Sequence, residues 1–153
     1  MGKRSALEAQ KGSCICMVKK ALPWYQEGLR FQCTGCGACC TGAPGYVWVT
    51  DENIKEIAQY LHITPEECRR KYVKRVDNRF TLKELPISYD CVFLQGRRCT
   101  IYPVRPKQCR TFPWWKENLD SIAEWKETAR RCEGIDHKDS PLISLKEIQS
   151  QLD

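Results

Sequence analysis

The clearest pattern of apolar and polar positions predicts a helix over residues 51–61. Apolar side chains recur there at one-turn spacing and form a single stripe along one face: Ile54, Ile57, Ala58 and Leu61. Thr50 precedes the stripe as a candidate N-cap, and two acidic residues follow it at the positive end of the helix dipole. We therefore expect an amphipathic helix that packs on a core through this stripe.

A second helix is predicted to begin after Thr64. Thr64 can serve as the N-cap, Pro65 as the first helical residue, and Glu67 as the closing member of a capping box. Cys68 and Tyr72 share one face of this helix, so we expect Cys68 to be a packed residue. The surrounding basic side chains are expected to form a solvated helix face: Arg69, Arg70, Lys71, Lys74 and Arg75.

Two more helices are predicted in the last third of the chain. Residues 122–131 have helical spacing of apolar positions. Ser144 and Glu147 form a second candidate capping box, which indicates a short final helix.

The strand signals are short and fall in the middle of the chain. Residues 45–50 form a β-like run, and residues 80–85 alternate weakly, as an edge strand does. Residues 91–94 and 99–102 predict a hairpin with Gly96 in its turn. The proline-rich stretch that follows is expected to be stiff but without regular pairing.

Together these elements predict an α+β fold. We expect a small single domain in which short helices pack with a small antiparallel sheet and hairpin, and long loops carry cysteines. The predicted organisation is an N-terminal arm over residues 1–28, a cysteine-cluster domain over 29–136 and a helical tail over 137–153.

The overall composition narrows the class of protein. Of 153 residues, 42% are apolar and 29% are charged, the balance of a globular protein. No apolar run reaches the roughly 20 residues of a membrane-spanning helix, so we expect no membrane partner. The net charge of +6 permits an anionic partner. Since the basic residues lack interleaved exposed aromatics, nucleic acid is not expected.

The cysteine content is the unusual feature, at 11 residues. A disulfide framework requires an oxidising compartment. The first twenty residues are charged and do not form a signal peptide, so we expect a cytoplasmic location with reduced thiols. The odd number also fits poorly with complete pairing. We therefore expect the cysteines to bind metal.

The strongest motif is a C-x-x-C-x-x-C-C run from Cys33 to Cys40. Two-residue spacing lets thiolates converge on a metal, and the intervening glycines give the backbone room to wrap. The first three cysteines match a bacterial ferredoxin loop, but the fourth does not. In an extended backbone, the adjacent Cys39 and Cys40 would point to opposite sides and serve two metal positions, or one metal position and a packing contact.

Later cysteines supply further candidate ligands. Three of them frame the hairpin and the proline-rich stretch, and one follows the helix over residues 122–131. The predicted ligand set is then Cys33, Cys36, Cys39, Cys40, Cys91, Cys99, Cys109 and Cys132. Eight thiolates match two four-cysteine sites, or one 4Fe–4S cluster with a separate zinc or spare thiols. Nearby basic residues can offset their charge: Arg97, Arg98, Arg105, Lys107 and Arg110.

With these motifs in place, residues 31–135 resemble the CxxCxxCC cysteine-cluster family, the YkgJ-like zinc- or iron-chelating domain found mostly in bacteria. The matching segments are 31–40, 45–49, Ile57 with Ala58 and Leu61, 91–94, 99–102, 105–113 and Cys132. The resemblance implies metal binding by these cysteines and little about biological role. Larger relatives with a similar run include flagellin lysine methylases, in which an iron–sulfur cluster is associated with the motif.

Two positions depart from the family pattern. His62 stands where the family usually has glycine after the helix, which affects the helix C-cap. Glu133 replaces the usual proline after the last cysteine. This departure leaves His137 as an alternative ligand to Cys132, although an exposed loop histidine is the simpler interpretation.

The sequence thus predicts a protein that coordinates zinc or iron, as single ions or an iron–sulfur cluster. One alternative is a 4Fe–4S redox protein or an accessory of a cluster-dependent enzyme, and another is a zinc-organised interaction module for an acidic partner. The sequence contains no phosphate-binding loop and no Ser–His–Asp arrangement, so it indicates no particular enzymatic activity. Whether the protein is an enzyme stays open. Cys14 and Cys16 are expected to be exposed thiols. Four aromatics are expected to cover the metal: Tyr102, Phe112, Trp114 and Trp115.

Overall fold

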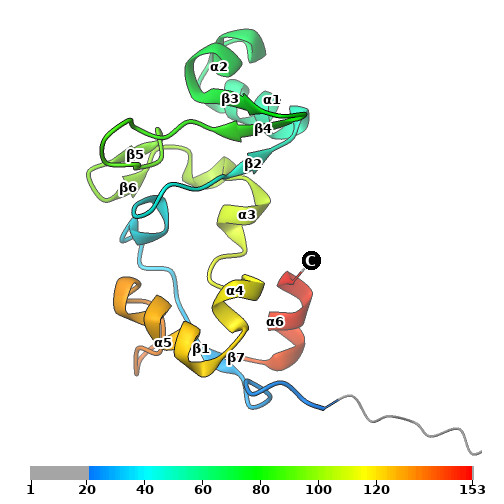
Figure 1. Cartoon of the computed structure of the whole chain (residues 1–153), viewed down its shortest axis with the longest axis vertical. Helices are drawn as coiled ribbons and strands as arrows, with labels where there is room; N and C mark the ends of the chain where they lie inside the picture. Colours follow the sequence, from blue (N-terminus) through cyan, green and yellow to red (C-terminus); the bar gives the residue numbers. More distant parts are fainter. Residues whose placement is uncertain (1–20, 153) are drawn as a thin grey trace, which may run out of the picture.

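The computed structural model describes residues 21–152 and has an α+β architecture of short helices and small antiparallel sheets, as predicted (Figure 1). Along the chain the elements are β1 (Leu29–Arg30), η1 (Ala38–Cys40), β2 (Trp48–Val49), α1 (Asp51–Tyr60), α2 (Pro65–Tyr72), β3 (Val73–Val76), β4 (Arg79–Leu82), β5 (Leu94–Gln95), β6 (Arg98–Cys99), η2 (Tyr102–Val104), α3 (Lys107–Arg110), α4 (Lys116–Leu119), α5 (Ile122–Arg131), β7 (Leu142–Ile143) and α6 (Leu145–Gln151).

The helices begin at the caps that the sequence predicts. The Thr50 side chain accepts a hydrogen bond from the Asn53 backbone at 3.2 Å, and the Asn53 side chain accepts one from the Thr50 backbone at 3.1 Å. The capping box predicted for α6 is also present. Thr64 caps α2, but the expected box does not form, because the Glu67 side chain instead pairs with Lys71 at 2.6 Å.

The largest sheet has the strand order β2-β4-β3. The prediction that residues 80–85 form an edge strand is wrong, because β4 is paired on both sides. Thr81 lies opposite Trp48 on one neighbour and Lys74 on the other, and is fully buried. The expected helix face is also shorter than predicted, since Lys74 and Arg75 belong to β3 rather than to α2.

The predicted hairpin forms, although its strands are shorter than expected. Leu94 in β5 pairs with Cys99 in β6, and Gly96 occupies the turn with a φ of 61°. The second strand ends early because the chain turns into η2 at residues 102–104.

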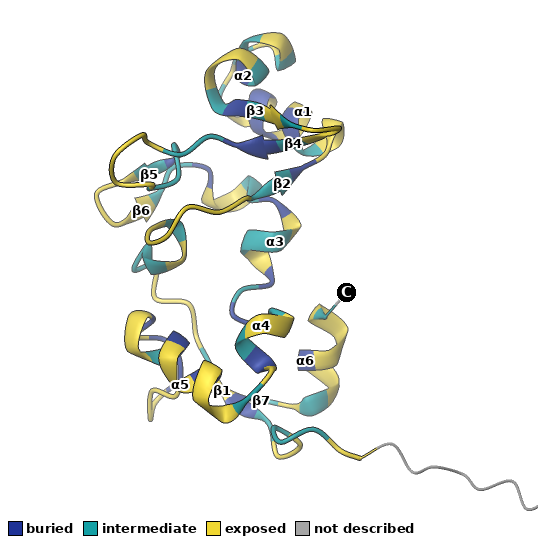
Figure 2. Cartoon of the chain, in the orientation of Figure 1, coloured by how far each residue is buried: buried dark blue, intermediate teal, exposed yellow. Residues whose placement is uncertain are grey.

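Two hydrophobic clusters form the core, one at each end of the molecule (Figures 1 and 2). The sheet cluster consists of Val49, Ile54, Ile57, Ala58, Cys68, Val73, Leu82, Phe93 and Ile101. The tryptophan cluster consists of Leu29, Trp114, Leu119, Trp125, Cys132, Ile135 and Ile148. The stripe predicted on α1 contributes Ile54, Ile57 and Ala58 to the sheet cluster, and Leu61 is partly buried against it.

Both ends of the described chain pack on the tryptophan cluster. β1 pairs with β7, which returns the C-terminal segment to the start of the fold. From the N-terminal side, the Trp24 indole donates a hydrogen bond to the Leu119 carbonyl at 2.8 Å. From the C-terminal side, α6 inserts the fully buried Ile148.

We expect Ile148→Ala to lower the free energy of unfolding by about 2–5 kcal/mol, because it removes a fully buried side chain and leaves a cavity. Ile87 is a matched control, since its side chain is 92% exposed. Ile87→Ala should change the free energy by less than about 0.5 kcal/mol. Chemical denaturation of the two variants measures both effects. Equal stability of the two variants would show that α6 does not contribute to the core.

Candidate metal centre

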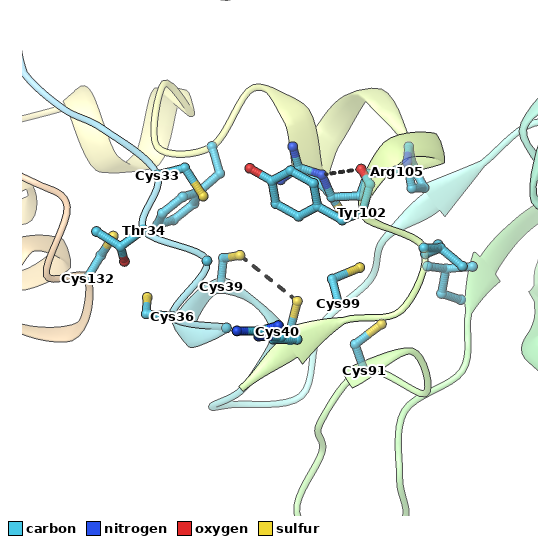
Figure 3. Close-up of a pocket in the computed structure, with 18 of the residues that line it drawn as sticks. Cys33, Thr34, Cys36, Cys39, Cys40, Cys91, Cys99, Tyr102, Arg105 and Cys132 are labelled. Carbon is cyan, nitrogen blue, oxygen red and sulfur yellow. Dashed lines mark hydrogen bonds between the residues drawn. The ribbon is translucent and has the colours of Figure 1, made fainter. Parts of the chain in front are cut away.

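A cavity of about 300 Å³ is lined by all eight cysteines of the predicted ligand set. Leu82 and Ile101 of the sheet cluster line one part of its wall, and Cys132 of the tryptophan cluster lines another. The cysteines lie up to 99 positions apart in the sequence, from Cys33 to Cys132, so only tertiary folding brings them together. Figure 3 shows how most of these side chains surround the cavity.

The cysteine loop from Cys33 to Cys40 approaches the β5–β6 hairpin very closely. Gly37 has a φ of 76°, and a Cβ at this position would lie 2.7 Å from the Arg97 carbonyl oxygen. Only glycine fits both the left-handed backbone and this contact. The Cys91 backbone then donates a hydrogen bond to the Cys40 carbonyl at 2.8 Å. These contacts hold the loop against the late cysteines.

The adjacent Cys39 and Cys40 do not diverge as an extended backbone would require. They lie in the 3-10 helix η1, and their sulfur atoms are 4.0 Å apart. With Zn–S bonds of about 2.3 Å, two sulfurs of a tetrahedral site are separated by roughly 3.8 Å. The pair therefore has the spacing of two ligands of one ion, and the expectation that the two thiols point apart is wrong.

Hydrogen bonding among the thiols raises the pKa of one of them and lowers the pKa of two others. Cys40 interacts with the sulfurs of both Cys39 and Cys99, which raises its own pKa. The same bonds lower the pKa of Cys39 to about 7 and that of Cys99 to about 6. The positive charge of Arg105 lowers both further. Two of these thiols are therefore readily ionised near neutral pH.

Burial acts in the opposite direction on three other thiols. It raises the pKa of Cys109 to about 12 and that of Cys132 to about 11, and it also raises the pKa of Cys91. The negative charge of neighbouring thiolates adds to each increase. A bound cation would reverse both effects, because it stabilises thiolates that burial disfavours.

Two of the five predicted basic residues line the cavity, namely Arg98 and Arg105. The Arg105 guanidinium lies 3.6 Å from the centre of the Tyr102 ring, and its Nε donates to the Tyr102 carbonyl at 2.9 Å. The Tyr102 hydroxyl interacts with the Cys33 thiol, which raises the pKa of Tyr102. This tyrosine contact was not expected from the sequence, although Tyr102 follows Cys99 by only three positions.

Aromatic side chains cover the cavity, but not all of those predicted. Tyr102 and Phe112 line it together with Phe31. In contrast, Trp114 stacks on Trp125 inside the tryptophan cluster, with ring centres 5.6 Å apart. Trp115 donates its indole hydrogen bond to a backbone carbonyl at 2.9 Å and does not line the cavity.

The departure at Glu133 has a structural role. Its carboxylate accepts a hydrogen bond from Thr34 at 2.9 Å and pairs with Arg97 at 3.5 Å. Close by in the sequence of both segments, the Gln32 backbone N–H donates a hydrogen bond to the Gly134 carbonyl at 3.1 Å. Glu133 therefore clamps the segment after Cys132 onto the cysteine loop.

The remaining predicted residues lie away from the cavity. Cys68 is fully buried in the sheet cluster, as expected. His137 does not line the cavity, and its imidazole is 3.9 Å from the Asp139 carboxylate. His62 adopts a φ of 55°, the left-handed conformation for which glycine is favoured. Cys14 and Cys16 lie outside the described residues.

The candidate ligands are cysteine sulfurs, which are soft donors, and they are spread around the cavity. Within residues 21–152, no three histidine, cysteine, aspartate or glutamate side chains are arranged to hold a single metal ion. Thiolate sulfur is nevertheless the preferred donor for zinc and for iron–sulfur clusters. Eight such donors on one cavity fit the chemistry of a thiophilic metal.

A fold and a cavity of this kind define a cysteine-rich domain, and comparison places it in a family. Residues 32–133 match the CxxCxxCC family, described as "Putative zinc- or iron-chelating domain", and the chain belongs to it. An uncharacterized protein of Methanocaldococcus jannaschii, MJ0661, is 36% identical over 92 residues. This match covers 59% of the chain and 48% of the relative, so the chain spans about half the length of that protein.

The comparisons with solved structures add no further relative, since none matches the chain significantly. Across the described residues, no helix combines the length and the apolar character needed to cross a membrane.

We expect the cavity thiols to react at different rates in the metal-free protein. At pH 7, a thiol with a pKa of about 6 is roughly nine-tenths ionised, so iodoacetamide should label Cys99 early. Cys68 should react last, because burial raises its pKa. As the pH falls through about 6, labelling of Cys99 should decline as its thiolate is protonated.

Peptide mapping by mass spectrometry measures these rates residue by residue. Cys109 serves as a second slow thiol, since its pKa is raised to about 12. Similar labelling rates for Cys99 and Cys68 at pH 7 would contradict the assignment.

Proposed function

We propose that this protein coordinates zinc or iron through the thiolates of Cys33, Cys36, Cys39, Cys40, Cys91, Cys99, Cys109 and Cys132. The observation that carries the proposal is that all eight side chains line one cavity. Membership of a family described as zinc- or iron-chelating supports the same chemistry. In the bound state the metal would supply positive charge and strong bonds to sulfur.

The pKa values of the cavity thiols favour a bound cation over eight free thiols. Cys39 and Cys99 ionise near neutral pH, whereas Cys109 is held protonated by burial and by the charges of its neighbours. A bound cation would stabilise thiolates of both kinds, because it attracts their negative charge and replaces the proton that burial retains. The two arginines of the cavity wall balance the charge of Cys39 and Cys99 alone, so ionisation of the other thiols needs further positive charge.

A metal at this position would cross-link the two hydrophobic clusters. Cys91 and Cys99 pack against the sheet cluster, whereas Cys36 packs against the tryptophan cluster and Cys132 is one of its members. Metal–sulfur bonds to both groups would therefore fix the ends of the molecule relative to each other. We propose that this cross-link is a major source of tertiary stability.

The nature of the metal decides between a structural role and a redox role. Metal and sulfide analysis of protein purified without oxygen, together with a visible spectrum, separates the two. Zinc without visible absorbance would indicate a structural centre, for which protein partners are the next question. Iron with acid-labile sulfide would indicate an iron–sulfur cluster and electron-transfer chemistry.

We expect Cys91→Ala to lose at least half of the bound metal and to melt at a lower temperature. Cys91 lines the cavity, and its loss removes one ligand of the centre. The matched control is Cys68→Ala, which removes a cysteine that lies in the sheet cluster outside the cavity. It should keep the metal content of the wild type even if core packing weakens. A Cys91→Ala protein with wild-type metal content and melting temperature would refute the proposal.

We further expect a strong chelator to lower the melting temperature of the wild-type protein. A ligand present at a thousandfold excess over its Kd stabilises the folded state by about 4 kcal/mol. Tryptophan fluorescence and calorimetry report the transition, since the tryptophan cluster contains Trp114 and Trp125. Metal affinity should fall as pH falls, because protons compete for buried thiols such as Cys132, whose pKa is raised. A melting curve unaffected by the chelator would contradict the cross-linking role.

A further inference from the structure

The β2-β4-β3 sheet (Figure 1) has an inner face that packs on α1 and an outer face that is partly exposed. Val73 and Leu82 lie opposite each other and belong to the sheet cluster together with the α1 stripe, so they mark the inner face. Side chains alternate along a strand, so Thr81, next to Leu82, belongs to the outer face. Trp48 and Lys74 both lie opposite Thr81 and therefore share the outer face.

Two aromatic rings and two basic side chains form a continuous stack on the outer face. The Tyr46 and Trp48 rings are stacked, with centres 4.9 Å apart and planes inclined by 26°. The Arg79 guanidinium lies 3.8 Å from the centre of the Trp48 ring, and the Lys74 ammonium lies 5.7 Å from the centre of the Tyr46 ring. A cation is attracted to the negative face of an aromatic ring. These contacts therefore orient both rings at the surface.

The stack is accessible and positively charged. Tyr46 is 49% exposed, and Arg79 is also exposed. Within residues 21–152, no carboxylate lies within ion-pair distance of Arg79. An acidic neighbour, Glu84, pairs with Lys74 at 3.7 Å and accepts a hydrogen bond from the Gly45 backbone at 2.9 Å. Glu84 therefore offsets the charge of Lys74 but not that of Arg79.

The Gln108 side chain closes the edge of the sheet beside the stack. Its amide nitrogen donates a hydrogen bond to the Tyr46 carbonyl at 2.9 Å, and its amide oxygen accepts one from the Trp48 backbone at 3.2 Å. These backbone groups are satisfied within the chain and do not pair with a further strand. A partner at the stack is therefore recognised through ring faces and charge rather than by addition of a strand to β2.

We propose that the outer face binds single-stranded nucleic acid. Unpaired bases stack on exposed aromatic rings, and their phosphates bind nearby arginine and lysine side chains. A base stacks on Tyr46, and Arg79 and Lys74 bind phosphates. Bases inside a duplex are already stacked on both faces, so a duplex offers the ring no free base. An acidic peptide uses the charges but gives the Tyr46 ring no planar partner.

Nucleic acid was not expected from the sequence, because the basic residues have no aromatics interleaved with them along the chain. Folding supplies these aromatics from elsewhere. Tyr46 and Trp48 come from the segment that forms β2, whereas Lys74 belongs to β3 and Arg79 to β4. None of the four lines the cysteine cavity, so this inference goes beyond the proposed function and does not depend on it.

Fluorescence anisotropy with labelled oligonucleotides tests the proposal on the full chain as purified. The first probe is a mixed-sequence DNA single strand of about twelve nucleotides. The second is an abasic strand of the same length, which has the same phosphates and no bases. We expect the first probe to bind more tightly than the second, and binding of both to weaken steeply as salt rises.

Two pairs of variants separate stacking from charge. Tyr46→Ala should weaken binding of the first probe about tenfold and leave the abasic strand unaffected, because only stacking is lost. Tyr60→Ala is its matched control, since Tyr60 is 42% exposed on α1. Arg79→Gln should weaken binding of both probes and lower the salt slope by about 1. Arg131→Gln removes the same charge from an exposed position on α5 and should change neither property.

The outcomes decide between nucleic acid and other anions. Failure of the wild type to bind the first probe would overturn the proposal. Equal binding of the two probes, or tighter binding of polyglutamate than of the first probe, would also overturn it, because bases would then contribute nothing. If circular dichroism shows that Tyr46→Ala does not fold, Arg79→Gln and Arg131→Gln still decide, since equal affinities of these two variants would contradict the site. Metal analysis of the same samples keeps this result separate from the proposed function.

Discussion

The convergence of eight thiols on one cavity is the constraint on which the rest of the structure depends. Regular secondary structure contributes little to it, since five of the seven strands in the described residues span only two residues. Neither hydrophobic cluster encloses the cavity alone, and each supplies part of its wall. The sulfur atoms therefore lie at the junction between two small cores, where a bond between them has the greatest effect on tertiary structure.

The cysteine loop is built to reach both cores at once. On one side Gly37 permits contact with the Arg97 backbone at a distance that excludes any side chain. On the other side the Gln32 backbone donates to Gly134, next to the Glu133 clamp. Because both contacts involve the loop backbone, the positions of the thiols follow from the path of the chain. The C-x-x-C-x-x-C-C segment thus determines how the loop packs on its neighbours, and it also supplies candidate ligands.

The sequence predicts best what local interactions determine. The N-cap at Thr50, the limits of α5 and the capping box of α6 follow from neighbouring residues, and all three are present. Strand order depends on pairing between distant segments, so the central position of β4 could not be derived from weak alternation. The eight cysteines singled out in the sequence all line the cavity, but the spacing of Cys39 and Cys40 does not predict the 3-10 turn in which they lie. Spacing alone therefore could not orient that pair.

Charge balance limits what the cavity can hold. Complete ionisation would place eight negative charges beside two arginines, Arg98 and Arg105. One divalent ion would still leave four charges uncompensated, which a partly buried site tolerates poorly. A second divalent ion reduces the excess to two. If all eight thiols ionise, charge balance therefore favours more positive charge than a single divalent ion supplies.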